Sequence, residues 1–483
     1  MKTKFILPHG MQIEFSNLLG QRRLDVVDIN GFIDDIAAKT EKAINEIRIN
    51  GVAKEHYSKD GNLEHIYFLR MPYVKDGYPN TPQSILKLIN YREKFKQIDA
   101  VIFLGIGGSY LGAQVLVDTI GGFSWNYNTP LRKGFPRIYF SGNNLDAEDC
   151  QELIAELLRH AEKKNERTKE KFNVLLIPIS KSGTTLETIL SFMHFYEILK
   201  SADDISLKCA VVTDLNAKLE NAPLLQLAEK FNWDRFDIKE GIGGRFSVMT
   251  DPGLLALTAV GGNIEEFLQG AKDMDEYCQK AHIKENPAFI NAVLKYLAYC
   301  KGVDIEVFMP YCMRLKALSE WYVQLLAESL GKRFDRNGQE VNYGRTPVVA
   351  VGTTDMHAQT QQHQEGKRNK IIQFAEVNQI ENDITIKNPF NDVEVLSKYT
   401  GLKMHDALKI ALDANEKALN SDNRYNAKFV IPQINEYYLG QFMYFLMLSV
   451  AYEGEIANVD AYNQPGVEIY KKFMKEELSN IIL

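Results

Sequence analysis

Two serines, two threonines and a lysine cluster in the segment S-K-S-G-T-T at 180–185. The segment follows an apolar run and precedes a helical pattern, so it lies where a buried strand gives way to a helix. The first turn of a helix offers unpaired backbone N–H groups and the positive end of the helix dipole. Hydroxyl groups and a lysine would add further donors, and the glycine lets the loop curl. The pattern predicts a phosphate-binding loop formed by Ser180, Lys181, Ser182 and Thr185.

The same loop has a plainer interpretation as a helix cap. Thr184 and Glu187 have the spacing of a capping box, but a cap leaves the serines and the lysine unexplained. The G-x-x-x-x-G-K spacing of nucleotide-binding P-loops is absent, so no nucleotide is implied. Glu187 is assigned to the binding site as a residue that positions the loop or an arginine, with helix capping as an equal alternative.

A second glycine-rich turn, G-I-G-G-S at 105–109, also follows an apolar run and precedes a helical pattern. Alone, it is as compatible with a purely structural turn as with ligand binding. The carboxyl ends of parallel strands lie at one edge of a sheet, so neighbouring strands would bring the two turns together. Gly108 and Ser109 are therefore expected beside the loop at 180–185, in one crevice.

The strands that would hold these loops are predicted from short apolar runs without alternation, which is typical of strands buried on both faces. Helical segments separate the runs, and this alternation predicts parallel sheets covered on both sides. The runs lie at 100–105, 136–142, 173–180 and 208–214, and again at 304–310 and 346–352. Their recurrence indicates two related α/β units, a weak internal repeat.

The chain of 483 residues is long enough for two or three domains, and its expected fold class is α/β. A helix-rich extension is expected at 1–97 and the first doubly wound domain at 98–262. The second domain is expected at 263–404, and a helical segment at 405–483 packs on it. The uncharged stretch at 437–452 is shorter than the roughly 20 residues of a membrane-spanning helix and is expected in the core.

Composition and charge exclude several classes of protein. Hydrophobic residues make up 45% and charged residues 25% of the chain, which is typical of a globular protein. The net charge of −7 argues against nucleic acid as a partner, so an anionic ligand would need a local positive field. Five scattered cysteines without a C-x-x-C pair predict neither disulfides nor a zinc site, and fit a reducing cytoplasm. The N-terminal residues do not form a signal peptide.

Several ordered segments together resemble a known family. G-I-G-G-S-Y-L-G at 105–112 and S-K-S-G-T-T-L-E-T at 180–188 are similar to sugar isomerase (SIS) domains, which bind phosphosugars. Two longer segments resemble the signatures of the glucose-6-phosphate isomerases, namely G-G-R-F-S-V-M-T-D-P-G-L at 243–254 and D-A-Y-N-Q-P-G-V-E-I-Y-K at 460–471. Two more resemble the remaining active-site segments, namely A-E-S-L-G-K at 327–332 and T-D-M-H-A-Q at 354–359.

The resemblance implies a reversible aldose–ketose isomerisation of glucose 6-phosphate to fructose 6-phosphate, a step of glycolysis and gluconeogenesis. The reaction would proceed by ring opening and proton transfer through a cis-enediolate. Glu328 is similar by position to the base that moves a proton between C2 and C1. Arg245 matches the cation that stabilises the enediolate. His357 and Lys471 match the pair that opens the ring, and Gln464 matches a substrate contact.

The resemblance also implies the assembly and the cofactor requirement. The fold would consist of two doubly wound parallel-sheet SIS domains with helical N- and C-terminal extensions. The reaction would need no metal and no other cofactor. The family resemblance suggests a cytoplasmic homodimer with shared active sites, in which His357 comes from the other subunit, and no membrane partner.

Two other functions fit part of the pattern. A noncatalytic phosphosugar-binding SIS regulator would keep the segments at 105–109 and 180–185, but it has no need for Glu328, Arg245, His357 and Lys471 together. A relative acting also on mannose 6-phosphate would differ only in the stereochemistry that it accepts at C2. The sequence leaves the second alternative open.

Overall fold

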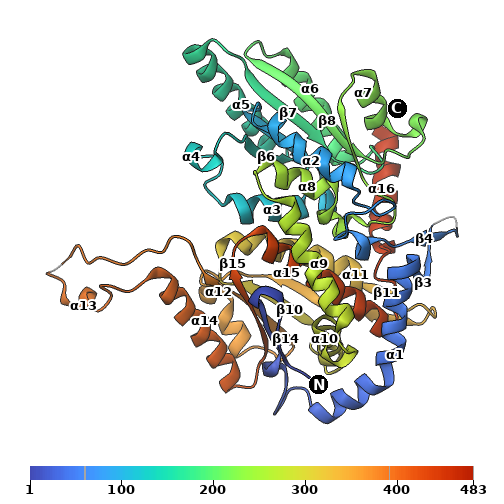
Figure 1. Cartoon of the computed structure of the whole chain (residues 1–483), viewed down its shortest axis with the longest axis vertical. Coiled ribbons are helices and arrows are strands. Elements are labelled where there is room, and N and C mark those ends of the chain that lie inside the picture. Colours follow the sequence, from blue (N-terminus) through green and yellow to red (C-terminus); the bar gives the residue numbers. More distant parts are fainter. Residues whose placement is uncertain (59–60, 391, 482–483) are drawn as a thin grey trace.

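Two lobes, each built around its own sheet, form the molecule (Figure 1). The computed structural model describes residues 1–58, 61–390 and 392–481. The first lobe, uppermost in Figure 1, holds a five-stranded sheet, and the second lobe below it holds a six-stranded sheet. The N-terminus lies in the second lobe, and the last helix, α16 (Pro465–Ile481), runs from the junction of the lobes along the first.

The first sheet is parallel throughout, with the strand order β6-β5-β7-β8-β9. Alternate residues of its central strand enter different cores: Val101 and Phe103 join one apolar cluster, and Ile102 and Leu104 join another. This burial on both faces confirms the strands predicted from non-alternating apolar runs. The strands are β5 (Ala100–Leu104), β6 (Arg137–Ser141), β7 (Phe172–Pro178), β8 (Ile205–Thr213) and β9 (Asp234–Asp237).

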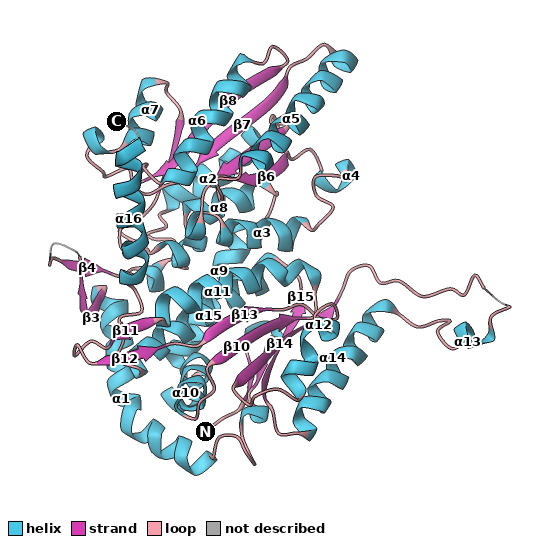
Figure 2. Ribbon diagram, turned by 180° about the vertical axis from the view of Figure 1, so that it is seen from behind, coloured by secondary structure: helices cyan, strands magenta, loops and turns pink. Residues whose placement is uncertain are grey.

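Helices cover both faces of this sheet (Figure 2). Those that begin near the carboxyl ends of β5 and β7 are α3 and α6, and each follows one of the two turns singled out in the sequence. The helices of the first lobe are α2 (Pro82–Phe95), α3 (Leu111–Gly121), α4 (Thr129–Arg132), α5 (Ala147–Thr168), α6 (Leu186–Ser201), α7 (Pro223–Lys230) and α8 (Asp251–Ala259).

The second sheet repeats the arrangement of the first. Its strands β13, β10, β14 and β15 are parallel and stand in the same relative order as β6, β5, β7 and β8. The prediction of two doubly wound parallel sheets is therefore confirmed. The bounds are β10 (Ile305–Pro310), β13 (Thr346–Val349), β14 (Lys370–Gln379) and β15 (Tyr425–Gln433).

The N-terminal segment and the segment expected to be a helical C-terminal extension both contribute strands to this second sheet. The sequence did not indicate these strands. β2 (Gln12–Glu14) pairs antiparallel with β15, and β1 (Lys4–Ile6) pairs antiparallel with β2, so these two strands extend the sheet beyond β15. The segments expected to be helical extensions are thus mixed, because residues 425–433 form a buried strand and the first 14 residues form two. The N-terminal segment continues with α1 (Val26–Asn50) and the hairpin β3 (Val52–Tyr57) and β4 (Leu63–His65).

Helix α15 (Glu436–Ile456) is the centre of the second lobe, with 18 of its 21 residues buried. Two glycines let it approach α9 (Ile264–Lys280) closely: a side chain on Gly270 would lie 1.8 Å from Tyr437 O, and one on Gly440 would lie 1.9 Å from Phe267 O. The prediction that the stretch at 437–452 belongs to the core is confirmed. None of the described helices combines the length and the apolarity that crossing a membrane requires.

The second lobe also carries a projecting arm, residues 380–390 and 392–403, which extends away from both sheets (Figures 1 and 2). It contains the short helix α13 (Glu394–Ser397) and leads into α14 (Met404–Ser421). The remaining elements of this lobe are α10 (Pro287–Cys300), α11 (Lys316–Leu330), β11 (Lys332–Phe334), β12 (Glu340–Tyr343) and α12 (Met356–Gln364).

Candidate active site

The turn at 105–109 and the loop at 180–185 leave adjacent strands at the point where the strand order reverses. β5 pairs in parallel with β7, and the N–H of Ile179 donates to Leu104 O at 2.7 Å. From β5 the chain passes to β6 on one side and then to β7 on the other, which makes this gap the topological switch point. Such sheets bind ligands in the crevice outside this point. The prediction that the two turns lie side by side is confirmed.

Hydrogen bonds between side-chain hydroxyl groups and backbone within the loop at 180–185 fix its conformation. Ser180 is buried and its hydroxyl bonds to Thr185 Oγ1 at 2.8 Å and accepts the N–H of Gly183 at 3.1 Å. Gly183 has a φ of 68°, a left-handed conformation that favours glycine. Lys181 and Ser182 are exposed.

The start of α6 differs from the capping box that the sequence suggested. Its N-cap is Thr185 rather than Thr184, and within the described chain no side-chain cap bond forms there. The capping-box interpretation with Glu187 is therefore wrong. Glu187 lies half-buried in the first turn of the helix. The first turn of a helix has unpaired backbone N–H groups, and this turn follows the loop at the switch point, which suits a phosphate group.

The turn at 105–109 meets the segment at 243–254 at two glycines. A side chain on Gly108 would lie 2.1 Å from the carbonyl carbon of Gly244, so only glycine fits there. Ser247 reinforces the contact by donating to Gly108 O at 3.3 Å. Ser109 ends the short 3-10 helix Gly107–Ser109 beside it. This contact places the next residue, Arg245, at the junction of the two lobes.

Arg245 is only 1% exposed and joins three segments of the chain. Its Nε donates to Ser329 Oγ at 2.7 Å, and one Nη1 bond of 2.7 Å reaches Gln464 Oε1. A second Nη1 bond of 3.3 Å reaches Glu328 Oε2. Nη2 donates to the carbonyls of residues 461 and 463, at 2.5 and 3.2 Å. A guanidinium has five N–H donors, and protein acceptors take all five.

Glu328 lies in the last turn of α11, the helix that follows β10 in the chain. Its carboxylate accepts from Arg245 on one oxygen and from Gln324 Nε2, at 3.1 Å, on the other. The side chain keeps 27% of its surface accessible, so a ligand in the crevice can reach it. Gln324 also lies against the first turn, because a side chain on Gly107 would come within 3.0 Å of its Nε2.

A second buried cation, Lys332, lies beside this cluster. Its Nζ donates to Glu328 O at 2.5 Å and to Asn463 O at 2.9 Å. Burial, and then the charge of Arg245, lowers the pKa of Lys332 to about 7, although Asp460 and Glu328 act in the opposite direction. Neutral and charged forms of this lysine therefore coexist near neutral pH.

Asp460 brings a residue of the N-terminal segment into the same network. His56 Nδ1 lies 2.9 Å from Asp460 Oδ2, and both side chains are buried. Burial alone would raise the pKa of Asp460, but the hydrogen bond and charge of His56 hold it below its usual value. The N-terminal segment, in which the sequence analysis identified no site residue, thus contributes His56 to the site.

Comparison with known proteins identifies the family of this chain. The family model described as phosphoglucose isomerase matches residues 90–481. The chain belongs to the phosphoglucose isomerase family. It is 33% identical over 467 residues to the glucose-6-phosphate isomerase of Carboxydothermus hydrogenoformans, covering 96% of this chain and 93% of the relative. It is 32% identical to that of Methanocaldococcus jannaschii, covering 79% and 85%.

Solved structures show that the whole fold of this phosphoglucose isomerase family member is shared. A hypothetical protein of Thermus thermophilus superposes with a TM-score of 0.78 at 26% identity, covering 97% of this chain and 99% of that one. A glucose-6-phosphate isomerase of Chlamydia trachomatis superposes with a TM-score of 0.77 at 20% identity, covering 98% and 89%.

Two residues assigned from the family resemblance lie apart from the Arg245 cluster in the single chain. His357 is exposed in the first turn of α12 in the second lobe. Lys471 is exposed on α16, where its Nζ lies 3.2 Å from Glu468 Oε1. By contrast, Arg245, Glu328 and Gln464, taken from three distant segments, are brought into direct contact.

Sequence reasoning missed four polar residues of the cluster: Gln324, Lys332, Asp460 and His56. The first two stand four residues before and four after Glu328, and the helical spacing could have found Gln324 because such residues share a helix face. Asp460 opens a segment that was already recognised. His56 had no such signal, because its partner lies 404 residues away.

Proposed function

We propose that this chain interconverts glucose 6-phosphate and fructose 6-phosphate through a cis-enediolate, as an enzyme of glycolysis and gluconeogenesis in the cytoplasm. The observation that carries the proposal is the Glu328 carboxylate, held from both sides and accessible, in a cluster that contacts the turn at 105–109. After ring opening, Glu328 takes the proton from C2 and returns it to C1. Both transfers occur at one face of the substrate, so one carboxylate suffices.

Arg245 acts as a positioning residue and as a fixed charge. Since protein acceptors take its five donors, it orients Glu328 and Gln464 rather than donating directly to the substrate. Its charge lies in a water-excluded site, where a cation stabilises a developing enediolate oxygen more than it would in water. Gln464, fixed by this contact, is the proposed substrate contact on the C-terminal side.

Binding and ring opening fall to residues around this centre. The phosphate group is proposed to bind Ser180, Lys181, Ser182 and Thr185, with Gly108, Ser109 and Glu187 shaping the adjoining wall. Lys471 and His357 are proposed to transfer protons at the ring oxygen and the neighbouring hydroxyl during ring opening.

The direct test is turnover of fructose 6-phosphate in a coupled assay, after exhaustive dialysis against EDTA. Among the described residues no group of three or more His, Cys, Asp or Glu side chains could hold a metal ion. The proposed proton transfers use only side chains, so we expect full activity after chelation. Activity that chelation removes and a divalent metal restores would contradict the proposed mechanism. Binding without turnover would instead favour the phosphosugar-binding regulator.

Removing the loop side chains should weaken substrate binding more than catalysis. Lys181→Ala with Thr185→Ala deletes an exposed cation and the hydroxyl that holds Ser180, while Glu328 is untouched. We expect KM for both sugar phosphates to rise by about tenfold or more, with a smaller change in kcat, because the phosphate is bound equally in ground and transition states. The matched control is Thr168→Ala with Lys171→Ala, exposed at the end of α5. A KM equal to that of the control would place phosphate binding elsewhere.

The proposed assembly is a homodimer in which His357 completes the site of the other subunit. Two observations support it: His357 is exposed on α12, and the arm at 380–390 and 392–403 presents exposed hydrophobic side chains that single chains rarely leave to water. These side chains are Ile380, Ile384, Phe390, Val393, Val395 and Tyr399.

A hybrid dimer of Glu328→Gln and His357→Ala subunits tests this assembly. If base and histidine come from different subunits, the purified hybrid contains one intact site, and we expect about half of the wild-type activity. If both residues come from one subunit, every site carries a defect and the hybrid is as inactive as its parents. The two parent homodimers, purified with the same tags, are the controls.

A further inference from the structure

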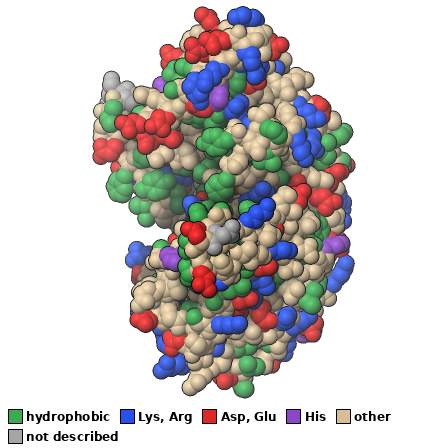
Figure 3. All heavy atoms as spheres, turned by 90° about the vertical axis from the view of Figure 1, so that its left-hand side faces the viewer, with side chains coloured by type: hydrophobic (Ala, Val, Ile, Leu, Met, Phe, Trp, Pro, Cys, Tyr) green, Lys and Arg blue, Asp and Glu red, His purple; other side chains and the backbone are tan. Residues whose placement is uncertain are grey.

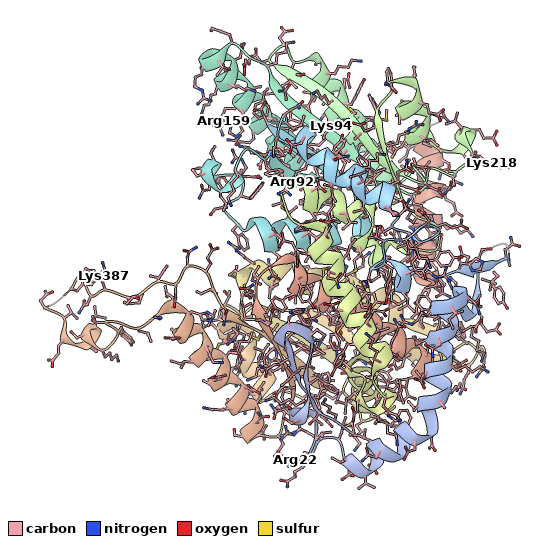
Figure 4. The ribbon with its side chains drawn as sticks, viewed as in Figure 1. Arg22, Arg92, Lys94, Arg159, Lys218 and Lys387 are labelled. Carbon is pink, nitrogen blue, oxygen red and sulfur yellow. The ribbon has the colours of Figure 1, made fainter. Side chains whose placement is uncertain are left out.

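A cavity of about 390 Å³ in the second lobe lies away from the candidate active site. It is bounded by the first residues of β14 and β15, Lys370 and Tyr425, and by the last turn of α12. These are the amino ends of the parallel strands, and none of the eleven lining residues belongs to the cluster around Arg245 and Glu328. Arg22, on the N-terminal segment, lies on the rim at the foot of the second lobe (Figure 4).

The lining of this cavity is strongly basic in a protein of net charge −7. Seven of its eleven lining residues are Lys or Arg, and none is Asp or Glu among the residues that the structure describes. On the face shown in Figure 3, by contrast, basic and acidic side chains are interspersed. Such a concentration of one sign in a recess creates a positive field that attracts anions.

One carboxylate, Asp422, neutralises only part of this charge. Arg368 Nη2 lies 2.5 Å from Asp422 Oδ1, and Arg424 Nε lies 2.8 Å from Asp422 Oδ2. The other five lining cations, within the described chain, form no ion pair with a carboxylate. They are Arg22, Arg23, Lys301, Lys367 and Lys370.

Lys370 shows the effect of this crowding. Burial lowers its pKa, and the charges of Arg424 and Lys367 lower it further against the opposing effect of Asp304. Among the described residues its Nζ donates to neutral oxygens only, Lys367 O and Asn369 Oδ1, both at 2.9 Å. Like charges that lower each other's pKa repel, and a bound anion between them would relieve the repulsion.

The inner wall contains polar atoms that the described chain leaves unsatisfied. His363 is 5% exposed, and its Nδ1 is buried without a hydrogen-bond partner among the described residues, as is Nε of Arg23. A buried ring nitrogen and a buried guanidinium N–H of this kind are rare in folded proteins, and each costs free energy unless a ligand or water satisfies it. Burial, and then Lys370, lowers the pKa of His363 to about 4, so the ring is neutral near pH 7.

We propose that this cavity is a binding site for a small organic polyphosphate, separate from the site that binds the sugar phosphate. Five unpaired cations need more negative charge than one phosphate group of about −2 carries. Arginine pairs bidentately with phosphate oxygens, and Tyr425 and Ile372 supply an apolar wall for an organic group. The recess and the acidic remainder of the surface disfavour an extended polyanion such as a nucleic acid.

Titration calorimetry with tripolyphosphate and with ATP, at 0.1 M salt, tests the site directly in the full chain. We expect both to bind, inorganic phosphate to bind more weakly, and saturating fructose 6-phosphate to displace neither. Reversing two exposed cations, Lys301→Glu with Lys367→Glu, should weaken tripolyphosphate binding by about tenfold or more. The matched control, Lys163→Glu with Lys171→Glu, makes the same change in net charge in the first lobe, on and just after α5 (the helix of Arg159 in Figure 4).

A second variant tests the inner wall without changing the net charge. His363→Phe removes the unsatisfied ring nitrogen but keeps an aromatic ring, so the thermal stability should be unchanged or higher while tripolyphosphate binding weakens. Equal weakening in the Lys301/Lys367 variant and in its control would mean that only net charge matters, and would overturn the proposal. So would displacement by fructose 6-phosphate, no binding at all, or an oligonucleotide that binds more tightly than tripolyphosphate.

Discussion

Glu328→Gln should abolish isomerisation while leaving sugar-phosphate binding intact. An amide cannot accept the proton from C2, and losing such acid–base help costs about a hundredfold to ten-thousandfold in kcat. The neighbouring side chains can accommodate the glutamine. Gln324 Oε1 is buried without a hydrogen-bond partner among the described residues. A flip of the Gln324 amide would therefore let this oxygen accept a hydrogen bond from the NH2 group of the new glutamine. The contact to Arg245 would then be kept through the remaining oxygen.

Isotope transfer gives this prediction a specific measurement. With wild-type enzyme and glucose 6-phosphate deuterated at C2, part of the label should appear at C1 of the product. The rest should exchange with water while it resides on the carboxylate. The variant should show neither, yet should still catalyse anomerisation of its substrate, because ring opening is assigned to His357 and Lys471. Activity is measured against Glu320→Gln, on the same helix, which removes only a half-exposed ion pair with Lys316.

Two outcomes would contradict this division of roles. Normal isomerisation by Glu328→Gln would mean that another group moves the proton. Loss of anomerisation in proportion to isomerisation would mean that the substitution disturbs binding or ring opening, and that Glu328 does not act in one step alone.

Those parts of the site that depend on local pattern could be predicted from the sequence. β5 and β7 are short apolar runs followed by turns, and a parallel sheet places the carboxyl ends of neighbouring strands together. The sequence alone therefore predicts that the loop at 180–185 and the turn at 105–109 lie side by side. The contact of Arg245 with Glu328 and Gln464 joins segments that were recognised by resemblance, but their meeting atoms were not predictable.

What the sequence could not predict depends on partners far away in the chain. β2 pairs with β15 across more than 400 residues, and nothing in either short strand specifies the other. His56 meets Asp460 in the same way. The basic cavity is a further case: Arg22, Lys301 and Lys370 are ordinary surface cations in sequence, and only the fold gathers them around His363. Long-range packing, rather than local propensity, determines all three.

Arg245→Lys should prove far from conservative, with turnover falling about tenfold to a thousandfold, the range seen when an oxyanion-stabilising group is removed. A lysine has three donors in place of five and no planar fork, so contacts to Ser329, Gln464 and the backbone at 461 and 463 cannot all be kept. Glu328 would lose a partner that orients it.

The pKa of neighbouring Lys332 indicates whether a lysine at position 245 would keep its positive charge. In the same buried environment its pKa is lowered to about 7, and Arg245 is more completely buried still. A lysine at position 245 should therefore be partly neutral at pH 7.5, whereas a guanidinium stays charged. A lowered pKa means that protonation returns as the pH falls, so the variant should be relatively less impaired at pH 6 than at pH 8. The ratio of variant to wild-type kcat, measured across this range, cancels any titration that both enzymes share.

The control for this experiment is Arg159→Lys, an exposed arginine on α5 that pairs with Glu156 and should be indistinguishable from wild type. A melting temperature measured for each variant separates unfolding from a local defect. If the Arg245→Lys variant folds and turns over at nearly the wild-type rate, neither the charge nor the planar guanidinium of Arg245 is needed for catalysis. Arg245 would then only join the two lobes. If kcat falls equally at every pH while KM is unchanged, the lost geometry around Glu328, and not the lost charge, is the cause.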